Sequence, residues 1–212
     1  LLGYAELTRE RYRVRLGRLR NAAGLGFSGY DGAEVRVDVL DEFRVTGYAG
    51  RSLAPGLEEG RESALDPVEV FVPDRSSVLV GGALGWEPAA ATALELRYQL
   101  DLLSDRSAAV AERASLDARS GFLDPLALEL SADYDIAFDR IGKARLSLSV
   151  PLADRFTVQG TVRRYVPYFE LWTIWGYFSP VAYHEAELDV AWSVGPALSV
   201  RTGVAYRAYE DA

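Results

Sequence analysis

Apolar and polar residues alternate along nearly the whole chain of 212 residues. Between residues 92 and 102, Leu94, Leu96 and Leu100 fall on one side of an extended backbone, and Glu95 and Arg97 fall on the other. A period of two is typical of β-strands with one apolar face, because the side chains of a helix repeat every 3.6 residues. The pattern returns over 126–138, 143–150, 155–167, 183–194 and 198–209. The sequence therefore predicts an all-β fold of antiparallel, up-and-down strands.

Turn-forming residues divide this pattern into eleven expected strands. Many of them exceed the usual length of about five or six residues in globular sheets. Two connections are long, at about 53–75 and 168–181, and an up-and-down order of strands places both at the same end. The pattern is the same on both sides of 53–75, so we expect one domain over residues 1–212. The expected strands are 5–19, 23–39, 43–52, 76–87, 91–103, 108–119, 126–138, 143–151, 155–167, 182–194 and 197–209.

The composition excludes several classes of protein. The chain has no cysteine and one histidine, which excludes disulfides, cysteine nucleophiles and multi-histidine metal sites. The net charge of -8 and the pI of about 4.8 argue against nucleic acid as a partner, since binding to phosphates needs cationic side chains. The uncharged stretches 171–183 and 76–86 are shorter than the ~20 residues of a transmembrane helix. We expect no cofactor and no metal ion.

An antiparallel sheet with one apolar face must bury that face against a protein core or against lipid. The strand lengths match the ~9–11 residues of a tilted membrane-spanning strand, which favours lipid. Aromatic residues near strand ends also favour lipid, because they concentrate at membrane interfaces. The alternative is a soluble antiparallel sandwich or barrel that binds a partner. The aromatic residues on the apolar side are Trp86, Tyr98, Phe138, Phe156, Trp192 and Tyr206.

The alternation, turns and aromatic residues together resemble the bacterial outer-membrane β-barrel proteins of the porin-like kind, over essentially the whole chain. This resemblance implies an antiparallel, up-and-down transmembrane β-barrel in the outer membrane of a Gram-negative bacterium, in contact with membrane lipid. It implies a porin-like channel, or a transport scaffold, for small polar solutes or a partner protein. A non-conducting barrel that anchors a partner is the alternative.

Two features differ from that family. Bacterial single-chain barrels have even numbers of strands, whereas eleven are expected here. They commonly end on an aromatic residue, whereas this chain ends Tyr209-Glu210-Asp211-Ala212. The chain also has no methionine, as a processed or excised piece would. We therefore expect about 11–12 strands that belong to a larger barrel.

The polar side of each strand would line the lumen of such a barrel and set its selectivity. Arginines alternate with other residues from Arg9 to Arg15, which predicts a positively charged wall. A change of parity near Gly17 predicts a β-bulge. The residues expected to face the lumen are Arg9, Arg11, Arg13, Arg15, Glu95, Arg97, Glu129, Asp133, Lys143, Arg145, Arg163, Glu185, Glu187, Asp189, Arg201 and Arg207.

The segment 165–183 is rich in aromatic residues and contains Pro167 and Pro180. An aromatic belt with a loop folded into the barrel mouth is one interpretation. A binding surface for a partner or ligand is the other. The aromatic residues expected at the membrane interface are Trp86, Phe138, Trp172, Trp175, Trp192 and Tyr206.

His184 is the only histidine, and a histidine beside Glu185 resembles a general base. Its parity matches Leu188 and Trp192, however, so we expect an interfacial residue and no enzymatic activity. The acidic run of Glu185, Glu187 and Asp189 has oxygen ligands of the kind that bind calcium. We favour ion pairs with Arg163, Arg201 or Arg207 instead. The glycines of 81–85 lack a following helix pattern, so they predict sheet curvature and no nucleotide site.

Overall fold

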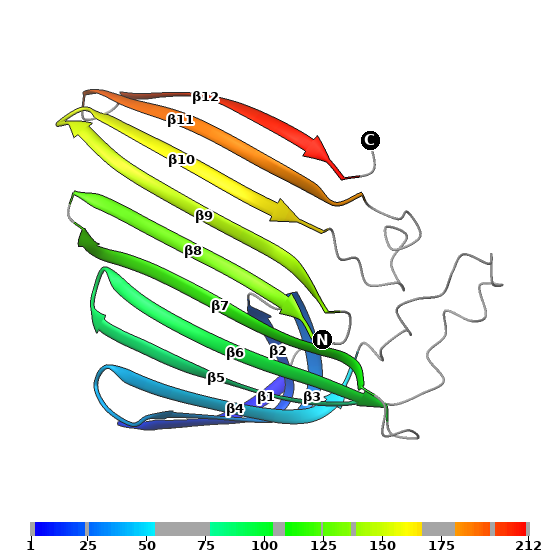
Figure 1. Ribbon diagram of the computed structural model, residues 1–212. Helices are drawn as coiled ribbons and strands as arrows, with labels where there is room; N and C mark the ends of the chain where they lie inside the picture. Colours follow the sequence, from blue (N-terminus) through cyan, green and yellow to red (C-terminus); the bar gives the residue numbers. More distant parts are fainter. Residues whose placement is uncertain are drawn as a thin grey trace.

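A computed structural model describes residues 3–23, 26–53, 77–103, 109–123, 125–136, 139–166, 181–195 and 198–210. These ranges form one antiparallel sheet of 12 strands and contain no helix (Figure 1). The prediction of an all-β, antiparallel, up-and-down fold is confirmed. The strands are β1 (Gly3–Arg9), β2 (Tyr12–Ala23), β3 (Gly26–Asp38), β4 (Phe43–Ser52), β5 (Ser77–Ala89), β6 (Thr92–Leu103), β7 (Ala109–Leu123), β8 (Leu126–Asp135), β9 (Arg140–Ala153), β10 (Phe156–Tyr165), β11 (Tyr183–Gly195) and β12 (Leu198–Tyr209).

The segment 5–19 was expected to be one strand, which is wrong. Glu10 and Arg11 form a tight turn, and β1 folds back on β2 with Arg9 opposite Tyr12. The turn was missed because it contains none of the glycine, asparagine or proline residues that mark most hairpins. The extra strand makes the number of described strands even.

The two ends of the sheet differ in their connections. Each odd-numbered strand joins the next strand through a short connection at one end, which we call the turn end. The opposite end, the loop end, carries the long connections after β4 and β10. The prediction that both long connections lie at the same end is therefore confirmed, although residues 54–76 and 167–180 lie outside the described ranges.

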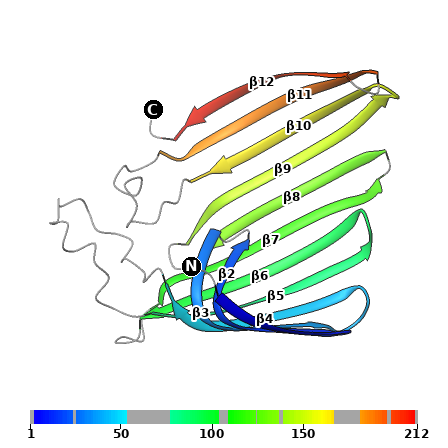
Figure 2. The ribbon, with the colours of Figure 1, turned by 180° about the vertical axis from the view of Figure 1, so that it is seen from behind.

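The sheet is strongly curved, most tightly over β1–β5 (Figures 1 and 2). On the concave side of this bend, Gly17 pairs with Gly32, and Gly32 pairs with Gly50. A Cβ atom on Gly32 would lie 2.1 Å from the carbonyl oxygen of Ala49, so only glycine permits this approach. Gly17 also has a φ of 134°, which favours glycine. The glycines thus allow the sheet to bend.

A small apolar cluster fills the inside of the bend. It contains Leu19, Tyr30, Tyr48 and Leu79, the buried hydrophobic side chains of the described residues. The rings of Tyr30 and Tyr48 stack with centroids 5.6 Å apart. A Cβ atom on Gly81 would lie 2.4 Å from the ring of Tyr48, so the absence of a side chain there lets the tyrosine lie flat on β5. No larger apolar core occurs in the described ranges.

The sheet is open, since β1 and β12 each pair with one neighbour only. β1 and β12 run in opposite directions because the strands alternate. Each edge therefore presents backbone groups that are free to pair with an antiparallel strand.

Candidate functional site: the polar concave face

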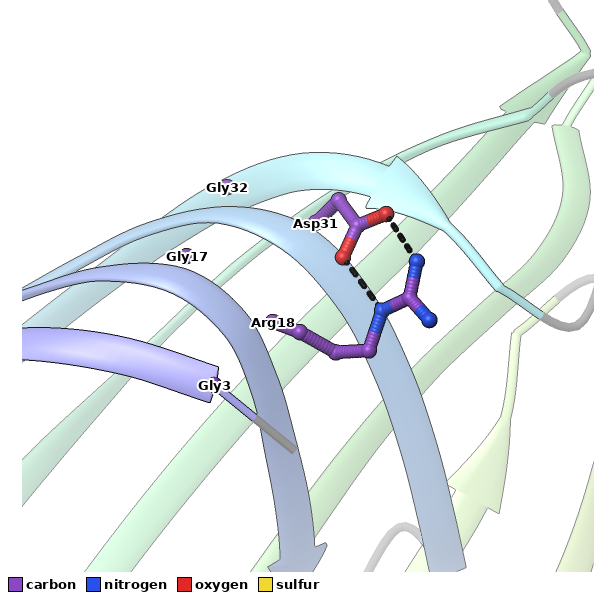
Figure 3. Close-up of a pocket in the computed structure, with 5 residues that line it drawn as sticks. All are labelled: Gly3, Gly17, Arg18, Asp31 and Gly32. Atoms are coloured by element: carbon purple, nitrogen blue, oxygen red, sulfur yellow. Dashed lines mark hydrogen bonds and ion pairs between the residues drawn. The ribbon is translucent and has the colours of Figure 1, made fainter. Parts of the chain in front are cut away.

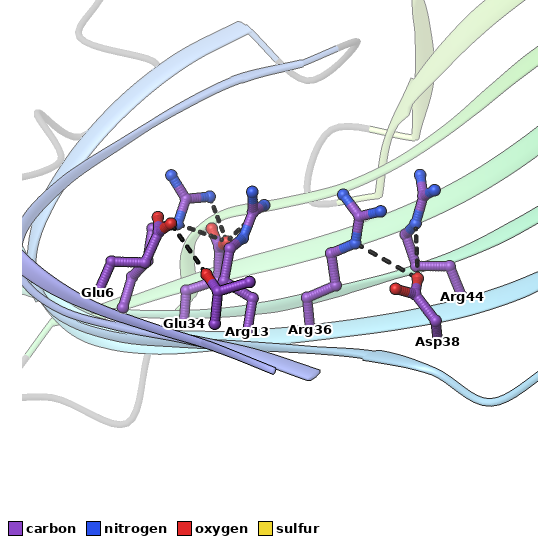
Figure 4. A network of polar contacts seen from close by, with 8 residues as sticks. Glu6, Arg13, Glu34, Arg36, Asp38 and Arg44 are labelled. Carbon is purple, nitrogen blue, oxygen red and sulfur yellow. Dashed lines mark hydrogen bonds and ion pairs between the residues drawn. The ribbon is translucent and has the colours of Figure 1, made fainter. Parts of the chain in front are cut away.

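The strand registers place the two residue sets of the alternation on opposite faces of the sheet. On the polar face, Arg97 lies opposite Ser115, and Glu129 lies opposite Ser147. On the apolar face, Leu96 lies opposite Leu116, and Leu130 lies opposite Leu146. The polar side chains of β1–β4 project into the concave side of the curved sheet (Figure 4). The sheet therefore curls towards its polar face.

Side chains of the polar, concave face are more buried than those of the apolar, convex face. Glu34 and Glu185 on the concave face are 7% and 5% exposed. Leu84 and Val204 on the convex face are 56% and 67% exposed. Buried polar residues also outnumber buried hydrophobic ones in the described ranges. The concave face is therefore the candidate functional site, and the convex face is an uncovered apolar surface.

The concave face holds all the residues that were expected to face a lumen, except Arg9 and Arg11. Arg9 pairs with Tyr12 and lies on the apolar face with Leu7, while Arg11 lies in the turn. The expectation of four arginines on one strand face is therefore wrong, because the turn at 10–11 divides them between strands. The other residues on the concave face are Arg13, Arg15, Glu95, Arg97, Glu129, Asp133, Lys143, Arg145, Arg163, Glu185, Glu187, Asp189, Arg201 and Arg207.

The expected β-bulge at Gly17 is also absent from the register. β2 pairs without interruption with both β1 and β3 through this position. The alternation therefore continues past Gly17 and places Arg18 on the convex face. The positive φ of Gly17 is the local irregularity that remains.

Four acidic residues of the concave face, Glu34, Asp38, Asp135 and Glu185, each lie near two arginines. Glu34 accepts a hydrogen bond from Arg15 Nε at 3.0 Å and lies 3.8 Å from Arg13 Nη2. Asp38 lies 3.5 Å from Arg36 Nε and 3.2 Å from Arg44 Nε (Figure 4). Glu34 therefore partly neutralises the positive charge of the arginines on β2, and Asp38 does the same for Arg36 on β3 and Arg44 on β4.

The same arrangement recurs at the other side of the sheet. Glu185 on β11 pairs with Arg163 on β10 and with Arg207 on β12, whose Nη2 lies 2.6 Å away. Asp135 lies 3.7 Å from Arg113 and 3.9 Å from Arg140. In each group, the acidic residue joins its strand to the arginines of the two neighbouring strands. Cross-strand ion pairs contribute roughly 0.2–1 kcal/mol each, so together they hold the wall of the concave face.

Sequence reasoning placed Asp135 on the polar side with Glu129 and Asp133, but it did not select Glu34, Asp38 or Arg113. The last three were missed. The signal was present, since the alternation over 26–38 and 109–119 places each of them on the polar side. What the sequence lacked was the register that brings them opposite the arginines.

An open hollow of about 460 Å³ lies on the concave face over β5–β9. Charges of both signs surround it, and Arg97 pairs with Glu95 on the same strand. Arg145 donates a hydrogen bond to Ser147 Oγ at 3.2 Å. The hollow is therefore a polar surface that offers both donors and acceptors to a solute. Its charged lining residues are Glu87, Glu95, Arg97, Asp117, Arg119, Glu129 and Arg145.

Three tyrosines lie side by side on the concave face at the loop end. Tyr183 on β11 contacts Tyr165 and Tyr209 with ring centroids 5.6 and 5.9 Å away. The guanidinium of Arg207 lies over the Tyr183 ring, 4.4 Å from its centroid. Arg207 therefore connects the tyrosines at the loop end to the ion-pair group of Glu185.

Aromatic side chains mark the convex face near the turn end. Phe43 stacks on Trp86 with centroids 6.2 Å apart, and Phe156 stacks on Trp192 at 5.9 Å. Tyr12 lies on the same face at the start of β2. Tyr134 and Tyr206 lie on this face nearer the loop end. Phe138, Trp172 and Trp175 lie outside the described residues.

The convex face carries charged side chains in the middle of β2 and β3 and at the loop end of β10–β12. Arg18 donates to both carboxylate oxygens of Asp31 at 2.8 Å (Figure 3). Glu210 accepts hydrogen bonds from Arg164 at 2.9 and 3.3 Å and lies 3.1 Å from His184 Nε2. The Arg164 guanidinium holds the pKa of Glu210 below its usual range. His184 thus lies at the loop end on the convex face, as its parity predicts, and faces away from Glu185.

Comparison with known proteins does not assign the chain to a protein family. No known protein family matches it, and no curated protein matches it. The described residues hold no group of three or more potential metal ligands. The described residues likewise include no helix of the length and apolarity needed to cross a membrane.

Proposed function

We propose that the chain forms the wall of a porin-like β-barrel in the outer membrane of a Gram-negative bacterium and passes small polar solutes along its concave face. The observation that carries this proposal is the reversed burial: the sheet curls towards its charged face and leaves its apolar face outside. In such a barrel, the convex face contacts lipid and the concave face lines the lumen.

The convex face has the composition that lipid contact requires. Between the aromatic residues and the charges of the loop end, β2–β4 carry only small or aliphatic outward residues. The ten residues of β4 suit a tilted strand that crosses the hydrocarbon, which takes about 9–11 residues. A charge within this band would be costly, since no water solvates it there. The outward residues of the band are Val14, Leu16, Ala33, Val35, Val37, Val45, Gly47 and Ala49.

A soluble sandwich fits the curvature less well. A sandwich buries the apolar faces of two sheets against each other. Here the apolar face is convex and continuous over twelve strands. Exposed apolar patches on soluble monomers rarely exceed a few hundred Å². A soluble protein would have to cover the entire outer surface of this sheet.

A membrane-embedded sheet cannot leave its edges unpaired, because unpaired backbone groups are costly in lipid. β1 and β12 run in opposite directions, so they can pair with each other or with further antiparallel strands. The proposal therefore requires both edges to be closed in the membrane. A barrel of about 8 strands is filled by side chains, whereas 16–18 strands leave an aqueous channel.

A non-conducting scaffold is the second candidate, and the ion-pair groups on the concave face favour it. Glu34 and Glu185 each hold two arginines and extend a network across the wall. Such a network in a narrow barrel fills the lumen, and the barrel would then anchor a partner.

Conductance in planar lipid bilayers distinguishes the two candidates. We expect stable steps that scale with salt concentration. Arg145→Leu should leave insertion intact and shift the selectivity towards cations, because it removes a positive charge beside Glu129 in the hollow. One charge at ~8 Å in water shifts the energy of a cation by about 0.5 kcal/mol and that of an anion by the same amount in the opposite direction. Screening over a Debye length of ~8 Å reduces each shift to about 0.2 kcal/mol, so the ratio of cation to anion permeability should change by about twofold. Silent bilayers that contain inserted protein would reject the channel and support the scaffold.

A further inference from the structure

The strongest unexplained feature of the convex face is a cationic row on β2, β3 and β4, which reaches the loop end at Arg51, next to the last residue of β4. Arg18, Asp31 and Arg51 lie in one row across β2, β3 and β4, with Asp31 opposite both arginines. The row lies beyond the aliphatic residues Leu16, Ala33 and Ala49 on the same strands. Given the proposed function, the row forms the boundary of the aliphatic band of β2–β4 on the side of the loop end.

The hydrogen bonding of the row leaves one arginine available. Both carboxylate oxygens of Asp31 accept hydrogen bonds from Arg18. Arg51 acts on Asp31 only through its charge, and within the described ranges its guanidinium has no hydrogen-bond acceptor. Two arginines and one aspartate give the row a net positive charge. The side chains of Arg18 and Asp31 are 46% and 42% exposed, so a ligand can reach them.

A shallow, open depression lies beside the Arg18–Asp31 pair. It has a volume of about 410 Å³ and is lined by Gly3, Gly17 and Gly32 beside the pair (Figure 3). The glycines leave the backbone uncovered there.

We propose that Arg18 and Arg51 bind the phosphate of an anionic lipid headgroup. This proposal rests on the proposed membrane location. A guanidinium matches phosphate oxygens with paired, charge-assisted hydrogen bonds. Long arginine side chains near the end of a membrane span also reach towards the interface. Basic clusters at this depth attract anionic headgroups.

The test uses the inserted protein in detergent micelles doped with phosphatidylglycerol or phosphatidylcholine, with retained lipid counted by native mass spectrometry. Insertion is first verified by circular dichroism and by heat-dependent migration on gels. We expect preferential retention of phosphatidylglycerol. Arg18→Gln with Arg51→Gln should reduce that retention by about fivefold for each arginine. Asp31→Asn should increase it, since the row gains positive charge.

Arg9→Gln is the matched control, because Arg9 lies on the same face at the turn end. It should change retention by less than about twofold. Equal retention of both lipids by the wild-type protein would overturn the lipid site. So would an Arg9→Gln effect as large as that of the double variant, which would indicate general charge attraction. A wild-type protein that fails to insert would contradict the proposed function itself, and that outcome is detected before any lipid is counted.

Discussion

Leu148→Arg is expected to lower the stability of the protein in lipid bilayers by about 2–4 kcal/mol, the cost of an arginine at the lipid-facing midplane of a barrel. Leu148 lies in the middle of β9 on the convex face, between Leu128 and Gly160. The guanidinium would enter hydrocarbon with no carboxylate opposite it. Reversible unfolding by denaturant in lipid vesicles measures the change.

Ser149→Arg is the control for this prediction. Ser149 is the next residue along β9 and lies on the concave face between Ala127 and Gln159. It therefore places the same charge in the proposed lumen, without a like charge directly opposite. We expect an unfolding free energy within about 0.5 kcal/mol of the wild type. Equal losses for both substitutions would contradict the assignment of the faces.

Gly50→Ala is expected to have the second large effect, because it removes the close approach on which the bend of β2–β5 depends. A Cβ atom at this position would lie 2.6 Å from the carbonyl oxygen of Asp31 and 2.8 Å from Gly32 Cα. Both atoms belong to the backbone, so relief requires the strands to separate. Overpacking of this kind costs about 1–3 kcal/mol. Folding yield and unfolding free energy in detergent measure the effect.

Gly47→Ala is the matched substitution in the same strand. Gly47 lies on the convex face, and a Cβ atom there would meet no other atom within 4 Å. We expect its stability to equal that of the wild type within about 0.5 kcal/mol. If Gly47→Ala destabilises as much as Gly50→Ala, the effect comes from general strand propensity and the steric account of the bend fails.

The alternation in the sequence was sufficient to predict strands and their faces. β4 occupies the predicted range of 43–52, and β6, β11 and β12 begin and end within about one residue of the prediction. The period of two survives small errors in strand bounds, since a face depends only on parity. Arg9 shows the limit of this reasoning, because a turn without turn-forming residues preserves the pattern while it reverses the chain.

The arrangement of the charges on the concave face could not be predicted in the same way. The sequence suggested that Glu185 pairs with arginines, and the structure places it between Arg163 and Arg207. The group around Glu34 was missed because it depends on the register of β2 against β3. Register is set by turn geometry and packing, neither of which a pattern of residue types contains.

The curvature also required the structure. Alternation is compatible with an apolar face on either side of a bend. The row of Gly17, Gly32 and Gly50 determines which face of the sheet becomes concave, because glycine lacks the side chain that would obstruct the bend on that face. The sequence pointed to curvature at 81–85 only, where Gly81 lies beneath Tyr48. The rest of the glycine row becomes visible when the strands are paired.

The most direct test of the central claim is lipid quenching at two adjacent residues of β8. Leu128 lies on the convex face opposite Leu148, and Glu129 lies on the concave face opposite Ser147. The chain has no native cysteine, so Leu128→Cys and Glu129→Cys each give one site for a fluorophore. In bilayers with brominated lipid chains, the label at 128 should be strongly quenched and the label at 129 should not. Quenching at 129 in place of 128 would contradict the account and assign the charged face to the outside.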